Sequence, residues 1–385
     1  MPINRNLEEE QILLRDTVRK FAEEIIRPQA KDLDEKEEFS YAITNQMAEM
    51  GLLGAFLPPE YDGSGLDYLS YIIVVEELSR IDGSQAATVA AHNSLGAGPL
   101  LYFGNDEQKK KYLPELAKGK LWGFGLTEPE AGSDAGNTQT TAVQDGDYWV
   151  LNGAKIFITN ASTDITLGST VLAVTGKDEN GRKEMSCFLV ENGTPGFETR
   201  PMKEKMMWRA SNTSELFFED CRVHKDAMLG KRGDGFKQML KTLDNGRLSI
   251  ASMGLGLAQG ALEYALKYAK ERKTFGKPIA QHQANSFKLA DIEMGIELAR
   301  TYLYDVCRML NEGEKITKEG AIAKLYCSEL AHKAANHCVQ ILGGYGLMKE
   351  YDAERYYRDQ KLLEIGEGTS EIQRLVISRA IGCFD

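Results

Sequence analysis

The sequence predicts an α+β protein in which two helical parts flank a β-rich middle part. Apolar residues recur at helical spacing before about residue 121 and again after about residue 231. Between them, β-branched and aromatic runs alternate with Asn-Gly and Asp-Gly pairs, which favour tight turns. With 385 residues the chain also exceeds one ordinary core. We therefore expect a helical domain over 1–121, a β domain over 122–230 and a second helical domain over 231–385.

The N-terminal part carries clear helical periodicity. Leu14, Val18, Phe21 and Ile25 form an apolar stripe. Pro28 is expected to end that helix, because proline lacks an N–H and its ring clashes with the preceding turn. The segments YLSYIIVVEELSRI and DEQKKKYLPELAKG continue the helical pattern.

Strand signals begin near Trp122. Four dipeptides predict turns between strands, because their residues tolerate positive φ: Asp145-Gly146, Asn152-Gly153, Asn180-Gly181 and Asn192-Gly193. The segment SELFFEDCRV reads as a further strand.

Helical periodicity returns after Gly235. The segment TKEGAIAKLYCSELAHKAANHCVQIL predicts one long helix that Gly343-Gly344 ends. Gly254, Gly256 and Gly260 do not match the G-x-G-x-x-G spacing of a dinucleotide-binding turn, and no strand precedes them. We interpret them as small residues that let two helices pack closely. The sequence then has no dinucleotide-binding unit, which argues against a nicotinamide-dependent dehydrogenase.

Composition excludes several classes. The formal net charge of -11 disfavours a nucleic-acid binder. Six cysteines without a C-x-x-C pair indicate reduced thiols, and His332 and His337 are five residues apart, so we expect no metal site. No apolar run could span a membrane and the acidic N-terminus does not resemble a targeting signal, which predicts a cytoplasmic protein.

The segment LLEIGEGTSEIQR places one carboxylate, Glu367, between two glycines. Ser370 and Gln373 form a capping-box pattern, so a helix is expected to begin there, with Glu371 in its first turn. Glu364 is either an ion-pair partner or solvated. Glu367 alone is then left in the loop.

Two further stretches are ambiguous by themselves. The glycine-rich loop in FGLTEPEAGSDAGNTQTTA would suit a phosphate or a polar heterocycle, or it is an ordinary surface loop. RKTFGKPI, between two helices, could grip phosphate through Arg272 or is a solvated basic turn.

Together, six motifs resemble the acyl-CoA dehydrogenase family, in family order over essentially the whole chain: LTEPEAGSDAG, LNGAKIFITNA, LDNGRLSIAS, RKTFGKPI, QILGGYG and EIGEGTSEIQR. The resemblance implies an N-terminal helical domain, a middle β-barrel domain and a C-terminal four-helix bundle. It also implies a homotetramer that holds FAD between the middle and C-terminal domains and across a subunit boundary.

The resemblance assigns site residues by position. Glu367 matches the catalytic base. The cofactor positions are Phe124, Leu126, Thr127, Gly132, Ser133, Phe157, Ile158, Thr159, Arg272, Phe275, Gln283, Gln340, Gly343, Gly344, Thr369 and Glu371. Of these, Arg272, Phe275 and Gln283 are expected to reach a neighbouring subunit's cofactor. The substrate positions are Ser133, Asp244, Arg247, Gly366 and Gly368.

The implied function is FAD-dependent α,β-dehydrogenation of an acyl-CoA in fatty acid or carboxylic acid degradation, with an electron-transferring flavoprotein as the acceptor. An acyl-CoA oxidase, an enoyl-CoA reductase and a non-catalytic flavin-binding scaffold are the alternatives. Two positions depart from the family pattern: Phe157 replaces a frequent tryptophan, and Gly366 replaces a tyrosine. Gly366 reflects either drift or room for a short branched or cyclic acyl group.

Overall fold

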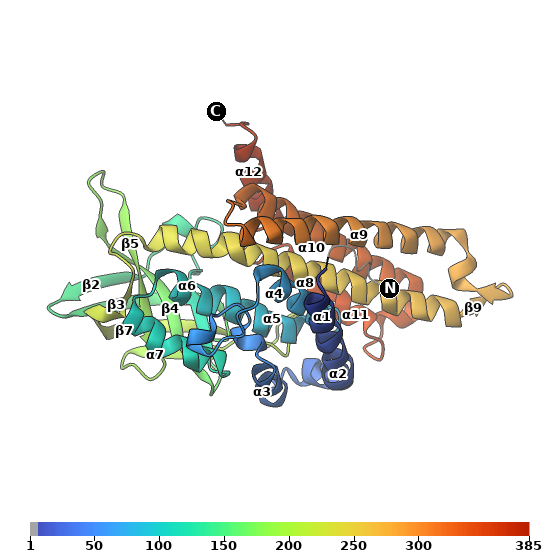
Figure 1. Ribbon diagram of the computed structural model, residues 1–385, viewed down its shortest axis with the longest axis horizontal. Coiled ribbons are helices and arrows are strands. Elements are labelled where there is room, and N and C mark those ends of the chain that lie inside the picture. The colour runs from blue at the N-terminus through green and yellow to red at the C-terminus, as the bar shows by residue number, and fades with distance from the viewer. Residues whose placement is uncertain (1–6, 385) are drawn as a thin grey trace.

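Three parts follow one another along the chain in the computed structural model, which describes residues 7–384 (Figure 1). The predicted order of helices, strands and helices is confirmed. The N-terminal helices are α1 (Glu9–Phe21), α2 (Arg27–Lys36), α3 (Tyr41–Glu49), α4 (Tyr68–Ser79), α5 (Gly83–Ala91), α6 (Gly98–Phe103) and α7 (Asp106–Ala117). A π-helical segment, η4 (His92–Ala97), joins α5 to α6.

Pro28 does not end the first helix, so that prediction is wrong. α1 passes into a π-helical turn, Ala22–Ile26, and α2 begins directly after it. Pro28 is the second residue of α2, and the helical backbone continues through it directly after the π-helical turn.

The middle part holds eight strands in one sheet. They are β1 (Leu121–Gly125), β2 (Thr141–Asp145), β3 (Tyr148–Thr159), β4 (Thr166–Lys177), β5 (Lys183–Glu191), β6 (Phe197–Pro201), β7 (Thr213–His224) and β8 (Met228–Leu229). The order is β6-β7-β3-β2-β4-β5-β8, with β1 parallel to β4. Over residues 7–384, β6 and β8 do not pair, so hydrogen bonding does not close the sheet into the expected barrel.

Two of the four predicted turns form hairpins. Asp145-Gly146 joins β2 to β3, and Asn180-Gly181 joins β4 to β5. Asn192-Gly193 ends β5 but leads to β6, which pairs with β7 instead. Asn152-Gly153 lies inside β3 at a register shift, so the turn predicted there is wrong. Gly153 has φ 145°, and a Cβ there would lie 2.7 Å from the Cα of Thr140, so both the backbone and the space require glycine.

The C-terminal part is built on the long helix α8 (Gly235–Glu271), which crosses the molecule in Figure 1. The remaining elements are a small hairpin of β9 (Lys273–Thr274) and β10 (Lys277–Pro278), then α9 (Gln283–Asn311), α10 (Thr317–Leu342), α11 (Ala353–Leu363) and α12 (Ser370–Ala380). The long predicted helix coincides with α10, and Gly343 ends it at φ 64°. α12 packs on α10 and projects from the body.

Gly254, Gly256 and Gly260 of α8 let neighbouring helices approach closely, as predicted. A Cβ at Gly254 would lie 2.7 Å from the carbonyl oxygen of Cys327 on α10. At Gly256 it would lie 2.2 Å from the carbonyl oxygen of Glu76 on α4, and at Gly260 2.0 Å from that of Arg80. A methyl group at any of these positions would therefore force helices apart.

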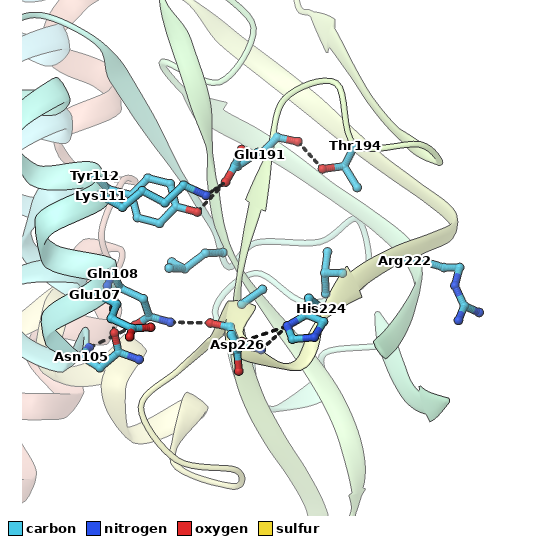
Figure 2. Close-up of a pocket in the computed structure, with 13 residues that line it drawn as sticks. Asn105, Glu107, Gln108, Lys111, Tyr112, Glu191, Thr194, Arg222, His224 and Asp226 are labelled. Atoms are coloured by element: carbon cyan, nitrogen blue, oxygen red, sulfur yellow. Dashed lines mark hydrogen bonds and ion pairs between the residues drawn. The ribbon is translucent and has the colours of Figure 1, made fainter. Parts of the chain in front are cut away.

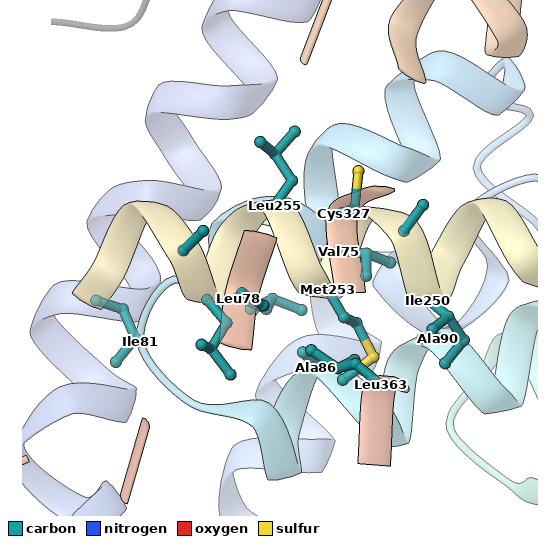
Figure 3. Packing of buried hydrophobic residues seen from close by; sticks show 14 of the residues in the cluster. Val75, Leu78, Ile81, Ala86, Ala90, Ile250, Met253, Leu255, Cys327 and Leu363 are labelled. Atoms are coloured by element: carbon teal, nitrogen blue, oxygen red, sulfur yellow. The ribbon is translucent and has the colours of Figure 1, made fainter. Parts of the chain in front are cut away.

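The main hydrophobic core surrounds α8. Figure 3 shows Ile250, Met253 and Leu255 of α8 among side chains of α4, α5, α10 and α11. Leu363, the last residue of α11, is fully buried in this core. The core therefore anchors the chain directly before the segment that carries Glu367. Among residues 7–384, no helix is both long and apolar enough to cross a bilayer.

Candidate active site

The segment between α11 and α12 is a tight corner with Glu367 at its tip. The Gly366 N–H donates to the Leu362 carbonyl (2.7 Å), and the Ser370 N–H donates to the Glu364 carbonyl (2.9 Å). Glu367 has φ 52° and Gly368 has φ 98°. Residues other than glycine rarely adopt a positive φ, so the backbone of Glu367 is strained. Backbone strain of this kind is often found at functional sites.

The first helical residue of α12 is Ser370, as predicted, but the capping box is wrong. Thr369 is the N-cap, and its Oγ1 accepts an N–H three residues on at 3.2 Å. The Gln373 Nε2 instead donates to the carbonyls of Glu367 (3.3 Å) and Gly368 (2.9 Å). Gln373 thus holds the corner from inside. Separately, the Glu367 N–H has no acceptor among residues 7–384.

The Glu367 carboxylate lies against α8 and η4. Its Oε2 is buried and makes no hydrogen bond. A Cβ built on Gly246 would lie 2.1 Å from this atom and 3.2 Å from Leu95 Cδ2. Burial raises the pKa of the Glu367 carboxyl to about 7, while the positive charges of Lys324 and Arg247 act in the opposite direction. A buried, unpaired carboxylate with such a pKa suits proton transfer near neutral pH.

The other two glutamates of this segment have ordinary surroundings. Glu364 accepts from Lys361 Nζ at 2.5 Å near the surface. Glu371 is exposed in the first turn of α12, where a backbone N–H and the Thr369 hydroxyl lower the pKa of its carboxyl. The pKa of the Glu371 carboxyl is thus lowered, whereas that of Glu367 is raised.

Asp244 and Arg247, two predicted substrate residues, flank Gly246 on α8. Arg247 Nη1 forms a 2.6 Å ion pair with Asp244 Oδ1, and Thr317 donates to the second Asp244 oxygen at 3.0 Å. Arg247 is buried, and its Nε makes no hydrogen bond. One donor of the guanidinium is therefore still available beside the corner.

On the β domain, Phe157 is turned out of its strand. It has φ 62°, and 61% of its surface is exposed. The neighbouring Ile158 packs into the β core, and Thr159 is half-buried. This part of β3 therefore presents an aromatic face, whereas Ile158 can offer only backbone atoms to a ligand.

The predicted polar loop lies beside β3. The Ile156 N–H donates to the Thr127 carbonyl at 2.9 Å, which ties the loop to the strand. Gly132 and Ser133 are exposed, and a Cβ at Gly132 would have no atom within 4 Å. Phe124 and Leu126 are buried in a core cluster, so they too offer only backbone atoms.

A third group of predicted residues gathers at the opposite end of the helical part. Arg272, Gln340 and Gly344 line a pocket of about 520 Å³. Gly343 and Gly344 have open space where a side chain would stand. The structure therefore brings together residues from two motifs, RKTFGKPI and QILGGYG, that lie about 70 positions apart in the sequence.

Phe275 and Gln283 do not join this pocket. Phe275 is 96% exposed, with φ 50° on the β9–β10 hairpin, and Gln283 is also exposed. The pocket is also remote from Glu367. Lys324, beside the corner, and Gln340, in the pocket, are 16 positions apart on α10, about 24 Å along a helix axis.

A second pocket, of about 420 Å³, lies between α7 and the sheet (Figure 2). None of the predicted site residues lines it. Its polar groups largely bind one another: Glu191 accepts from Lys111 (2.5 Å) and Tyr112 (2.6 Å), and His224 pairs with Asp226 (3.0 Å). We therefore do not place the chemistry there.

Sequence reasoning missed Gly246, Lys324 and Gln373. Lys324 carried a signal that could have been found: it falls on the same helical face as Ala321, Cys327 and other small apolar residues. A lysine on a buried helical face requires a partner. Gly246 carried no such signal, since its role depends on contact with Glu367, 121 positions away.

Three sequence profiles of one family match the chain. They are described as "Acyl-CoA dehydrogenase, N-terminal domain" over residues 8–120, "Acyl-CoA dehydrogenase, middle domain" over 123–221 and "Acyl-CoA dehydrogenase, C-terminal domain" over 233–382.

Curated relatives and solved structures agree. "Probable acyl-CoA dehydrogenase YngJ" of Bacillus subtilis is 50% identical, covering 98% of this chain and 100% of its own. "Acyl-CoA dehydrogenase, short-chain specific" of Clostridium acetobutylicum is 44% identical, covering 98% and 99%. Butyryl-CoA dehydrogenase of Megasphaera elsdenii has a TM-score of 0.94 at 41% identity, covering 98% and 99%. A chain in a structure described as "Electron transferring flavoprotein of Acidaminococcus fermentans" has a TM-score of 0.94 at 43% identity, covering 99% and 100%.

Proposed function

This chain belongs to the acyl-CoA dehydrogenase family of FAD-dependent oxidoreductases, and we propose that it dehydrogenates a short acyl-CoA with Glu367 as the base. One observation carries the assignment of the base: a buried carboxylate oxygen without a hydrogen-bond partner, held on a left-handed corner. In this reaction the base removes the α-proton of the thioester, and its pKa of about 7 suits that transfer.

The same corner supplies a donor for the thioester oxygen. Negative charge develops on that oxygen as the α-proton leaves, and backbone N–H groups stabilise such charge. The Glu367 N–H has no acceptor within residues 7–384 and is the donor that we assign. Glycine is needed at position 368, because a Cβ there would lie 2.7 Å from Gln373 Nε2 and disturb the hydrogen bonds that Gln373 donates to the corner.

The residues present fit FAD. Phe157 presents an exposed aromatic face, and the open loop at Gly132 and Ser133 leaves room for a phosphate group near backbone N–H donors. When bound, the flavin supplies the acceptor for the β-hydride. Phe157, Thr159 and the loop backbone orient the ring. Thr369, the N-cap of α12, and Glu371, in its first turn, lie beside the corner.

A second copy of the chain completes the cofactor site in this proposal. The pocket of Arg272, Gln340 and Gly344 is about 24 Å from the corner along α10, so one chain does not enclose a ring and its phosphates through both groups of residues. Phe275 is almost fully exposed, as expected for a residue that reaches a neighbour. We therefore keep the homotetramer as part of the proposal, with Arg272, Phe275 and Gln283 contributed across a subunit boundary.

Electron-transferring flavoprotein is the proposed acceptor, and acyl-CoA the proposed substrate. The similarity to short-chain specific relatives and to butyryl-CoA dehydrogenase supports a short acyl chain. The similarity to a chain from the electron-transferring flavoprotein structure supports the acceptor.

Bleaching of the flavin under anaerobic conditions tests the function. A panel of straight, branched and cyclic acyl-CoA thioesters should bleach the yellow protein, most rapidly with short chains. Peroxide formed with substrate in air would indicate an oxidase instead. Turnover of enoyl-CoA to acyl-CoA with an external electron donor, without turnover of acyl-CoA by electron-transferring flavoprotein, would indicate a reductase. Absence of bleaching with every thioester would leave only a flavin-binding scaffold.

Gly366 is proposed to make room for a branched or cyclic acyl group. Its backbone tolerates a side chain, since a Cβ would meet Leu362 at an ordinary 3.4 Å or more. Gly366→Tyr is therefore expected to fold and bind flavin, retain butyryl-CoA turnover and lose about tenfold or more in kcat/KM for branched substrates. Equal losses for straight and branched thioesters would contradict this role.

The rate of bleaching should depend on pH through Glu367. The carboxyl must be ionised to accept a proton, and burial places its pKa at about 7. The rate in a single turnover is therefore expected to rise from about pH 6 to about pH 8 and then level off. A rate that is already constant at about pH 5.5 would show that the base is ionised throughout and that its pKa is not raised.

A further inference from the structure

Lys324 is a buried lysine with an unusual set of partners. It lies on α10, its side chain is among the largest that are fully buried, and its Nζ donates to the Gly368 carbonyl at 2.8 Å. Within residues 7–384, no carboxylate lies within 4.0 Å of this ammonium. Burying an ammonium group is costly, so a lysine in this position needs negative charge nearby.

The negative charge that faces Lys324 is the corner itself. The charges that raise the pKa of Lys324 are those of Glu367 first, then Glu364 and Glu371. The last two have other surroundings, because Glu364 pairs with Lys361 and Glu371 is exposed. Glu367 is therefore the carboxylate whose charge Lys324 balances.

Arg247 is the other cation near the base, but its charge is already compensated. Its guanidinium forms a 2.6 Å ion pair with Asp244. Lys324 has no such pair, so it is the net positive charge in this region. The pKa of the Glu367 carboxyl accordingly responds to Lys324 more than to Arg247.

Resting on the proposed function, we infer that Lys324 is a positioning residue for the base: it holds the Gly368 carbonyl and balances the charge of the Glu367 carboxylate. The first contact keeps the left-handed corner turned toward the substrate. The second increases the fraction of the buried carboxylate that is ionised, and thus able to accept a proton, at neutral pH.

Other groups near the carboxylate are accounted for. Besides Lys324, the charged and titratable side chains that interact with the corner are Arg247, Tyr68, Tyr71, Glu364 and Glu371, and behind them stand Asp244, paired with Arg247, and Tyr102, beside the two tyrosines. Burial raises the pKa of each of the three tyrosines, so they stay neutral around pH 7. If the pKa of Glu367 changes when Lys324 is replaced, the change can therefore be attributed to the loss of the lysine charge.

Lys324→Met removes the charge but keeps the length of the side chain. Without the ammonium, the pKa of Glu367 should rise, so the pH dependence of bleaching should move upward by about one unit or more. At about pH 7 the rate should fall about fivefold or more, as expected when a pKa rises from about 7 to about 8. Burial lowers the pKa of Lys324 itself to about 8, so the wild-type lysine loses its charge at high pH. The difference between the two proteins should therefore shrink above about pH 9.

Three controls make the result decisive. Lys324→Arg keeps the charge and should retain most of the wild-type pH profile. Lys333→Met, an exposed lysine on the same helix, should leave the profile unchanged. The infrared carboxyl band that Glu367→Gln removes should titrate at higher pH in Lys324→Met, a readout independent of turnover.

A uniform loss of rate at every pH, with the infrared titration unmoved, would overturn the inference and leave Lys324 a structural residue. If Lys324→Met fails to fold, the infrared titration of Lys324→Arg decides, because a charge role requires its pKa to stay within about half a unit of wild type. Full turnover in Glu367→Gln would contradict the proposed function instead, so the two failures are distinguishable.

Discussion

Glu367→Gln should lower the rate of flavin bleaching by about 10³-fold while the protein stays yellow and folded. The amide has nearly the same shape as the carboxylate but cannot accept the α-proton. The corner should persist, because its hydrogen bonds come from the backbone, Gln373 and Lys324. Flavin absorbance, the melting temperature and anaerobic single-turnover kinetics would check these expectations.

Glu364→Gln is the matched control. It makes the same chemical change three positions earlier, at a glutamate whose partner Lys361 lies near the surface. A surface ion pair contributes about 1 kcal/mol or less, so little change in rate or stability is expected. Full activity in Glu367→Gln, or an equal loss in both variants, would show that Glu367 is not the base.

Gly246→Ala should give the second largest effect. The new methyl group would stand 2.1 Å from the Glu367 Oε2, so the carboxylate must move away from its position. Displacing a catalytic group by about 1 Å can cost about 10²-fold in rate. Alanine also favours a helix interior by about 1 kcal/mol over glycine, so the loss should not come from an unfolded α8.

A double-mutant cycle isolates this contact. If Gly246→Ala acts by displacing the base, it should have little further effect in the Glu367→Gln background, and the two losses should not add. Gly320→Ala serves as the control, because a Cβ on this buried α10 glycine would have no neighbour closer than 3.6 Å. Additive losses would mean that Gly246 serves another purpose, such as helix packing.

Much of the fold could be predicted because its signals are local. The periodicity of α10 and the turn residues Asp145-Gly146 and Asn180-Gly181 act within a few positions of themselves. The same reasoning was wrong at Pro28 and at Asn152-Gly153. A π-helical turn and a strand bulge are local irregularities that tertiary packing selects, and the sequence pattern alone does not distinguish them from an end or a turn.

In the candidate site, too, features set by local sequence could be predicted and features set by tertiary contacts could not. The loop position of Glu367 followed from its glycine neighbours, and the place of its carboxylate against Gly246 did not, because that contact joins segments 121 positions apart. The capping box at Ser370 was wrong for a related reason. Gln373 makes its hydrogen bonds to the corner, an arrangement that depends on how α12 meets α10. The roles assigned by family resemblance stay predictions until the variants are measured.

The continuity of α8 sets a limit on how this protein can change. The helix meets the sheet at Gly235, where a Cβ would lie 2.6 Å from Ser186, passes Glu367 at Gly246 and ends beside Arg272. Gly246 and Arg272 are thus 26 positions apart, or about 39 Å along one unbroken axis. Inserting or deleting a single residue between them would turn one end by about 100° relative to the other. The exposed positions of this stretch should accept substitutions, but the stretch should accept no change in length, whereas the exposed Asn180-Gly181 tip should accept both.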